Sequence, residues 1–80
     1  MAYERLSYTR HAQRRMKERG IHEAEVLRVL NSPDLTYLSY GKRVAEDVFE
    51  VGRLLRIVFV DTSESGADAR IISTIDLEEG

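Results

Sequence analysis

At 80 residues the chain has the length of one domain and not two, so we expect a single domain over residues 1–80, ordered from about 6 to 77. Its composition, 42% hydrophobic and 32% charged, excludes a wholly disordered chain. It contains no cysteine, which excludes disulfides and a thiolate nucleophile and fits a reducing cytoplasm. With a net charge of −2, any nucleic-acid partner would have to be held by a local basic patch.

The first segment with a clear pattern predicts a helix over Arg10–Arg19. Thr9 can cap its start through the side-chain hydroxyl, and Gly20 can adopt the left-handed conformation that ends a helix. At about 100° per residue, Ala12 and Met16 form the buried stripe. Two basic rows follow from the same spacing. His11, Arg15 and Arg19 lie along the edge of that stripe, and Arg10, Arg14 and Lys17 lie on the solvent side.

A second helix is expected over Glu23–Asn31. Glu23 and Glu25 fall in its first turn, where the positive end of the helix dipole favours acidic side chains. Ser32-Pro33 ends the helix, because proline disfavours the helical conformation in the residue before it. The apolar face of this helix is broad and consists of Val26, Leu27, Val29 and Leu30.

The residues after Pro33 are expected to form strands, over 35–40, 44–51, 54–61 and 70–77. Gly52-Arg53 has the pattern of a two-residue hairpin turn. The segment 54–61 is almost continuously apolar, which predicts a central strand covered on both faces. The expected fold is α+β, with two N-terminal helices packed on one face of an antiparallel sheet of three or four strands in an αα-ββββ meander. Its predicted core contains Ala12, Met16, Leu27, Leu30, Phe49, Ile57 and Phe59.

Three kinds of site are disfavoured by the residues present. His11 and His22 have no metal-ligand spacing, so neither a metal nor a cofactor is expected. Ser63 and Ser65 lie in a polar loop without a histidine nearby in the sequence, which argues against a serine nucleophile. No stretch approaches the roughly 20 apolar residues of a membrane span, and no signal peptide is evident, so we expect a cytoplasmic protein.

The row of His11, Arg15 and Arg19 has two interpretations. A histidine can move a proton, and two guanidinium groups one turn apart can hold a phosphate. Alternatively, His11 borders the core and both arginines pair with acidic strand residues such as Glu46, Asp47 or Glu50.

Arg56 has two interpretations as well, because a charge inside an apolar strand is costly unless it is paired or faces a cleft. It either clamps a phosphate at the open face of the sheet or pairs across the sheet with Glu50 or Glu46.

The motif His11-Ala12-x-x-Arg15-Met16-x-x-Arg19-Gly20-Ile21, together with the acidic start of the second helix and the strand 54–60, resembles the bacterial domain-of-unknown-function 4258 family. More distantly, with Arg70-Ile71-Ile72-Ser73, the chain is similar to the BrnT and RelE/ParE type of toxins. That resemblance implies metal-independent RNA cleavage and an antitoxin-like protein as partner. The chain departs from such toxins in its mildly acidic net charge. It also departs from them in the sequence of its C-terminal end, Asp76-Leu77-Glu78-Glu79-Gly80.

The leading hypothesis is therefore a toxin-like scaffold that binds RNA and, if catalytic, cleaves it. His11 would act as base or acid, Arg15, Arg19 and Arg56 would stabilise the negative charge of the phosphorane, and Arg10, Arg14 and Lys17 would bind phosphates. The alternative is a non-enzymatic interaction module whose basic helix docks an acidic protein. Ribonuclease activity requires His11 and Arg56 to face one open cleft, whereas the module does not. Both a monomer and a homodimer fit the sequence.

Overall fold

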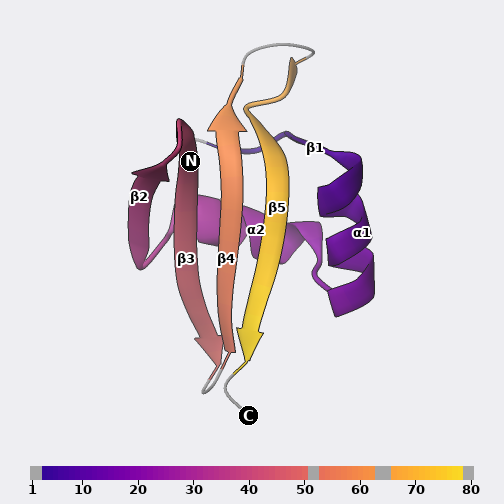
Figure 1. Cartoon of the computed structure of the whole chain (residues 1–80), viewed down its shortest axis with the longest axis vertical. Coiled ribbons are helices and arrows are strands. Elements are labelled where there is room, and N and C mark those ends of the chain that lie inside the picture. Colours follow the sequence, from indigo (N-terminus) through magenta and orange to yellow (C-terminus); the bar gives the residue numbers. More distant parts are fainter. Residues whose placement is uncertain (1–2, 51–52, 63–65, 79–80) are drawn as a thin grey trace.

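The computed structural model describes residues 3–50, 53–62 and 66–78 and shows two helices and a five-stranded sheet (Figure 1). The elements in chain order are β1 (Leu6–Tyr8), α1 (Arg10–Arg19), α2 (Glu23–Asn31), β2 (Leu35–Ser39), β3 (Lys42–Glu50), β4 (Arg53–Asp61) and β5 (Ala69–Glu78).

The sheet has the strand order β1-β5-β4-β3-β2. Strands β2 to β5 form the expected antiparallel meander, and the α+β class is confirmed. The expected count of three or four strands is wrong, because β1 adds a fifth strand that runs parallel to β5 and pairs with Ala69–Ile71. A three-residue strand has too few residues to show a periodic pattern, and its partner lies at the other end of the chain.

Both helices have the predicted bounds, because local signals set their ends. The hydroxyl of Thr9 accepts a hydrogen bond from the Ala12 N–H at 3.1 Å, and Gly20 adopts the left-handed conformation with φ 66°. At the start of α2, the carboxylate of Glu25 accepts from the His22 N–H at 3.0 Å. The chain leaves α2 just before Pro33.

The two helices take different positions on the sheet. Helix α2 crosses one face, over β3 and β4, whereas α1 runs alongside β5 and the end of β1 (Figure 1). In β4, the residues that face α2 are buried (Leu55, Ile57 and Phe59), and those between them are only half-buried. The expectation that this strand is covered on both faces is therefore wrong. Its apolar run reflects a central position in the sheet and not a second covering layer.

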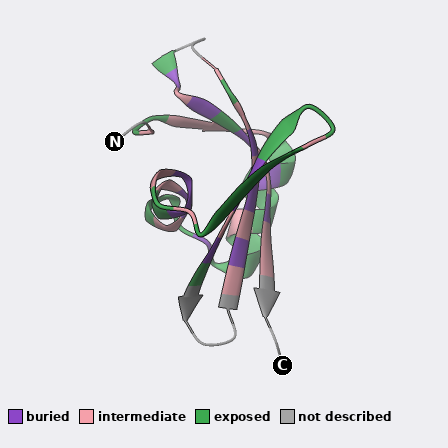
Figure 2. Ribbon diagram, turned by 90° about the vertical axis from the view of Figure 1, so that its left-hand side faces the viewer, coloured by how far each residue is buried: buried purple, intermediate pink, exposed green. Residues whose placement is uncertain are grey.

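The core lies between α1, α2 and the covered face of the sheet (Figure 2). Four of the predicted core residues are buried in it: Ala12, Leu30, Ile57 and Phe59. Met16 packs against it from its border, and Leu27 is half-buried. The side chain of Phe49 lies outside the described part.

The sequence predicts one hairpin turn, Gly52-Arg53, and the structure shows another. The turn between β2 and β3 consists of Tyr40 and Gly41, with φ of 50° and 77°, so β2 ends one residue before the predicted Tyr40 and β3 begins at Lys42. Positive φ at both central residues is the geometry that a two-residue hairpin requires. Of the predicted turn, Gly52 lies outside the described residues and Arg53 begins β4. Among the described residues, neither helix has the length and apolar composition of a membrane-crossing segment.

Candidate functional site

The start of α1 is fixed on β5 by the residue that caps it. The Thr9 N–H donates to the Ile71 carbonyl at 2.9 Å, and the Thr9 hydroxyl donates to the Ile72 carbonyl at 2.9 Å. Ala12, one turn into the helix, is fully buried. Because α1 is held at this end and rotated with Ala12 inward, the adjoining row of side chains points along β5.

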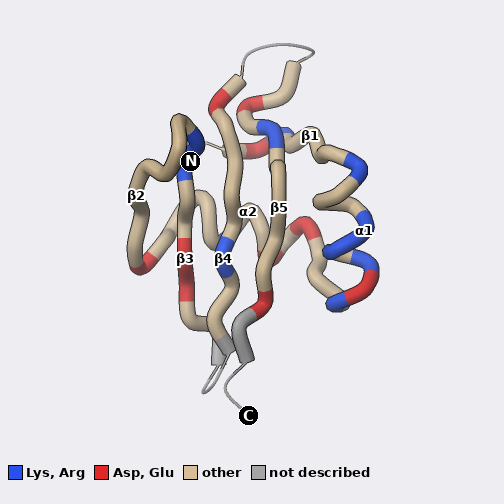
Figure 3. The backbone as a smooth tube through the Cα atoms, viewed as in Figure 1, with Lys and Arg blue, Asp and Glu red and all other residues tan. Residues whose placement is uncertain are grey.

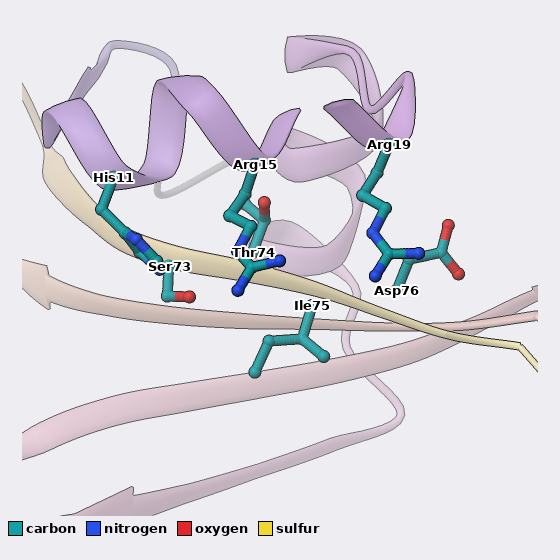
Figure 4. A pocket seen from close by; sticks show the side chains of 7 residues that line it. All are labelled: His11, Arg15, Arg19, Ser73, Thr74, Ile75 and Asp76. Carbon is teal, nitrogen blue, oxygen red and sulfur yellow. The ribbon is translucent and has the colours of Figure 1, made fainter. Parts of the chain in front are cut away.

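That row forms one wall of a cleft of about 370 Å³ between α1 and β5. Figure 4 shows His11 beside Ser73, Arg15 over Thr74 and Ile75, and Arg19 beside Asp76. The expected grouping of His11, Arg15 and Arg19 on one side of the helix is what the structure shows.

The cleft follows the edge of β5 and not one of its faces. Its floor consists of four consecutive residues, Ser73 to Asp76, and consecutive strand residues point to opposite faces of a sheet. Strand β1 pairs with β5 only as far as Ile71, so β5 borders α1 directly beyond that residue. The cleft begins where β1 ends.

The basic side chains of the cleft have no partner within the described ranges 3–50, 53–62 and 66–78. There, His11, Arg15 and Arg19 make neither a hydrogen bond nor an ion pair, and all three are exposed. The acidic strand residues proposed as their partners bind elsewhere. Glu46 pairs with Arg56, and Asp47 pairs with Arg28 of α2; the side chain of Glu50 is outside the described part.

One polar group on the cleft floor also lacks a partner. Thr74 is 1% exposed, and its hydroxyl has no hydrogen-bond partner among the described residues. A buried hydroxyl without a partner costs folding free energy, about 1–3 kcal/mol. Such a group in the floor of a cleft is suited to bond a ligand.

The second basic row, Arg10, Arg14 and Lys17, is exposed on the side of α1 away from the core and does not line the cleft. Together the two rows concentrate positive charge on one helix (Figure 3). Residues 10–19 carry five Lys or Arg and one Glu, a net charge of +4 within a chain of net −2, so all other residues sum to −6. The local basic patch that the sequence predicts is therefore α1.

The structure does not bring Arg56 to this cleft. Its Nε lies 2.8 Å from a Glu46 carboxylate oxygen, which also accepts from the Tyr37 hydroxyl at 2.8 Å. Since its neighbours Leu55 and Ile57 point into the core, Arg56 lies on the uncovered face of the sheet. Of the two interpretations of this residue, the structure shows the ion pair across the sheet, with Glu46 as partner.

The sequence model of the family described as "Domain of unknown function (DUF4258)" matches residues 8–76. The chain belongs to the DUF4258 family. The matched region contains the basic helix and the floor of the cleft. No curated protein and no solved structure matches the chain.

The floor of the cleft was not predicted from the sequence. Ser73, Thr74 and Asp76 interrupt the apolar pattern of the last strand, and this was the available signal. Polar residues in a strand usually face solvent. Their position opposite α1 could therefore be predicted only if the strand that borders this helix were known.

The chemistry available in the cleft is that of cations, hydroxyls and one carboxylate. The guanidinium groups can bind phosphate or carboxylate oxygens, and Ser73 and Thr74 can donate to or accept from a ligand. His11 is the side chain in the cleft best suited to move a proton near neutral pH. In the described part of the chain, no three His, Cys, Asp or Glu residues lie together as a metal site would need.

Proposed function

We propose that this DUF4258 domain binds single-stranded RNA along the cleft between α1 and β5. The observation that carries the proposal is the row of three exposed basic side chains, His11 and the guanidinium groups of Arg15 and Arg19, without partners among the described residues, on the α1 side of the cleft. Successive members are four residues apart on the helix, a rise of about 6 Å, and the row is about 12 Å long. A ligand with repeated negative charges matches such a row better than a single small anion.

The distribution of charge supports a polyanion at this place. A helix of net charge +4 on a molecule that is otherwise negative attracts a polyanion to α1 and repels it elsewhere. Arg10, Arg14 and Lys17 extend the positive surface beyond the cleft. The hydroxyls of Ser73 and Thr74 and the carboxylate of Asp76 can bond a ribose 2′-hydroxyl, which favours RNA over DNA.

Metal-independent cleavage, which the resemblance to BrnT and RelE/ParE toxins implies, has weaker geometric support. It needs a base and an acid within hydrogen-bond reach of one phosphate, about 3 Å. His11 lies at one end of the row, and Asp76 lies beside Arg19 at the other, about 12 Å along the helix. Arg56, the fourth residue expected in a catalytic site, is paired with Glu46 outside the cleft. We therefore propose binding as the function.

The test is the affinity of the full chain for a fluorescent single-stranded RNA, measured by anisotropy over a range of salt concentrations. Each phosphate contact contributes a slope of about −0.7 to log K against log salt. Arg15→Ala and Arg19→Ala should each weaken binding and reduce the slope by about 0.7. Arg70→Ala, an exposed arginine of β5 that does not line the cleft, is the matched control and should leave both unchanged.

Three further arms separate the alternatives. A DNA of the same sequence should bind more weakly than the RNA. Polyglutamate should compete poorly; strong competition together with weak RNA binding would instead indicate an acidic protein partner. Gel analysis of the RNA after incubation should show it intact, whereas cuts made by the wild type but not by His11→Ala would establish the ribonuclease.

A further inference from the structure

We propose that the cleft between α1 and β5 binds RNA together with a proton taken up by His11, so that the affinity for RNA rises as the pH falls below neutral. This inference rests on the proposed function and concerns the regulation of the same site. His11 lines the cleft beside Ser73, in one row with Arg15 and Arg19 (Figure 4). Histidine differs from arginine in that its charge changes between about pH 5 and 8. With His11 neutral the row carries two positive charges, and with His11 protonated it carries three.

The end of the cleft at His11 is suited to a phosphate group. His11 is in the first turn of α1, where the partial positive charge of a helix N-terminus attracts anions. This turn contains no acidic side chain that would take the place of such an anion. On the strand side, the hydroxyl of Ser73 can donate a hydrogen bond to the phosphate, as can the buried hydroxyl of Thr74, which has no partner among the described residues. A phosphate bound here lies beside the imidazole.

On α1 itself, the charged neighbours of His11 are basic. They are the residue before it and those three and four positions after it, Arg10, Arg14 and Arg15. The one acidic residue of the helix, Glu18, is two turns away from His11, about 10 Å along the helix axis. The helix therefore offers a protonated His11 no acidic partner one turn away.

The strands that pack against α1, which are β5 and β1, also leave His11 without an acidic partner. On β5, Asp76 is at the far end of the cleft, and Arg70 is exposed outside the cleft. On β1, the hydroxyl of Tyr8 donates to Glu23 at 2.6 Å. In the part of the chain that the structure describes, no carboxylate pairs with His11. The partner of a protonated His11 is therefore an anion that enters the cleft.

Proton uptake by His11 and phosphate binding strengthen each other. An anion close to a histidine favours its charged form. The protonated imidazole donates from both ring nitrogens, and its hydrogen bond to a phosphate is charge-assisted. Because linked binding equilibria are reciprocal, the protonated domain binds the phosphate more tightly by the same factor. One added charge-assisted hydrogen bond corresponds to an affinity higher by about tenfold.

The affinity of the full chain for a fluorescent oligouridylate, measured by anisotropy from about pH 8 to about pH 5, tests the coupling. Oligouridylate is the probe because neither its bases nor its phosphodiesters titrate in this range. The wild type should bind about tenfold more tightly at the acidic end. Its slope of log K against log salt should also be steeper there by about 0.7, the value for one added phosphate contact. Circular dichroism at each pH establishes that the protein is folded.

Three variants assign the proton to His11. His11→Gln cannot take up a proton and should lose both the pH response and the change of salt slope. His11→Arg carries a permanent charge, so it should lack the pH response and bind about tenfold more tightly than His11→Gln at about pH 8. His22→Gln is the matched control, because this exposed histidine does not line the cleft, and it should keep the full response. Asp47, whose pKa is raised by burial, lies on β3 and is retained in all three variants, so its titration produces no difference between them.

The outcomes separate this inference from the proposed function. If the wild type binds with the same affinity and salt slope at both ends of the pH range, the coupling is overturned, while weaker binding by Arg15→Ala and Arg19→Ala would still support the RNA site. An equal pH response in the wild type and His11→Gln, or a response that is lost in His22→Gln, would also overturn the coupling. Absence of binding at every pH would overturn both proposals.

Discussion

Thr74→Val removes the buried hydroxyl from the cleft floor and keeps a β-branched side chain of similar shape. This hydroxyl has no hydrogen-bond partner among the described residues, so no hydrogen bond compensates for its removal from water. Its burial therefore lowers the free energy of unfolding by about 1–3 kcal/mol. We expect the valine variant to be more stable by about 1 kcal/mol. For a domain of this size, that corresponds to a rise in Tm of about 4–8 °C.

The same substitution at Thr9 is the matched control, with the opposite expected sign. The Thr9 hydroxyl donates to Ile72 and accepts from Ala12, so Thr9→Val removes both bonds of a helix cap. Loss of a cap costs about 0.5–2 kcal/mol. Thermal unfolding followed by circular dichroism measures both variants. A lower Tm for Thr74→Val would refute the reasoning, because it would mean that this hydroxyl is bonded in the folded protein.

The RNA affinity of the same two variants tests whether the buried hydroxyl of Thr74 contributes to binding. If Thr74 bonds the ligand, the more stable Thr74→Val variant should bind RNA more weakly than the wild type. Stability and affinity would then move in opposite directions, as they do where a binding site retains an unsatisfied polar group. An unchanged affinity would place the ligand away from this part of the floor.

Three further predictions concern stability and are measured by urea unfolding over a range of pH. Leu30→Ala should cost about 2–5 kcal/mol, because Leu30 is buried in the core, and half-buried Leu27→Ala should cost less. Burial is the main cause that raises the pKa of Asp47, and the neighbouring carboxyl group of Asp34 raises it further. Because the ionised form of Asp47 is disfavoured in the folded protein, the stability of the domain falls as the pH rises through this raised pKa. Asp47→Asn should thus stabilise the domain at neutral pH, and the gain should shrink in acid. The N–H groups of Arg5 and Glu4 lower the pKa of Asp68, so its contribution is present above the ordinary pKa and lost as pH falls; Asp68→Asn should destabilise at neutral pH and differ little from the wild type in acid.

The parts of this fold that follow from neighbouring residues could be predicted, and those that depend on distant pairing could not. Thr9 and Gly20 fix the ends of α1 through bonds made within a few residues, and the predicted bounds are those observed. Arg56 needed an acidic partner, and the sequence left Glu46 and Glu50 open. The register of β3 against β4 decides between them, because it places Glu46 directly opposite Arg56.

The cleft itself depends on where β1 stops, which no local pattern shows. Strand β1 occupies the edge of β5 as far as Ile71, and at Thr9 the chain turns away into α1. The N–H and hydroxyl of Thr9 then bind the Ile71 and Ile72 carbonyls, so the first turn of the helix is set just beyond the last paired residue of β5. His11 therefore stands beside Ser73, and each following turn of α1 adds one cation along the strand. One capping threonine thus ends β1, begins α1 and aligns the basic row with the edge of β5.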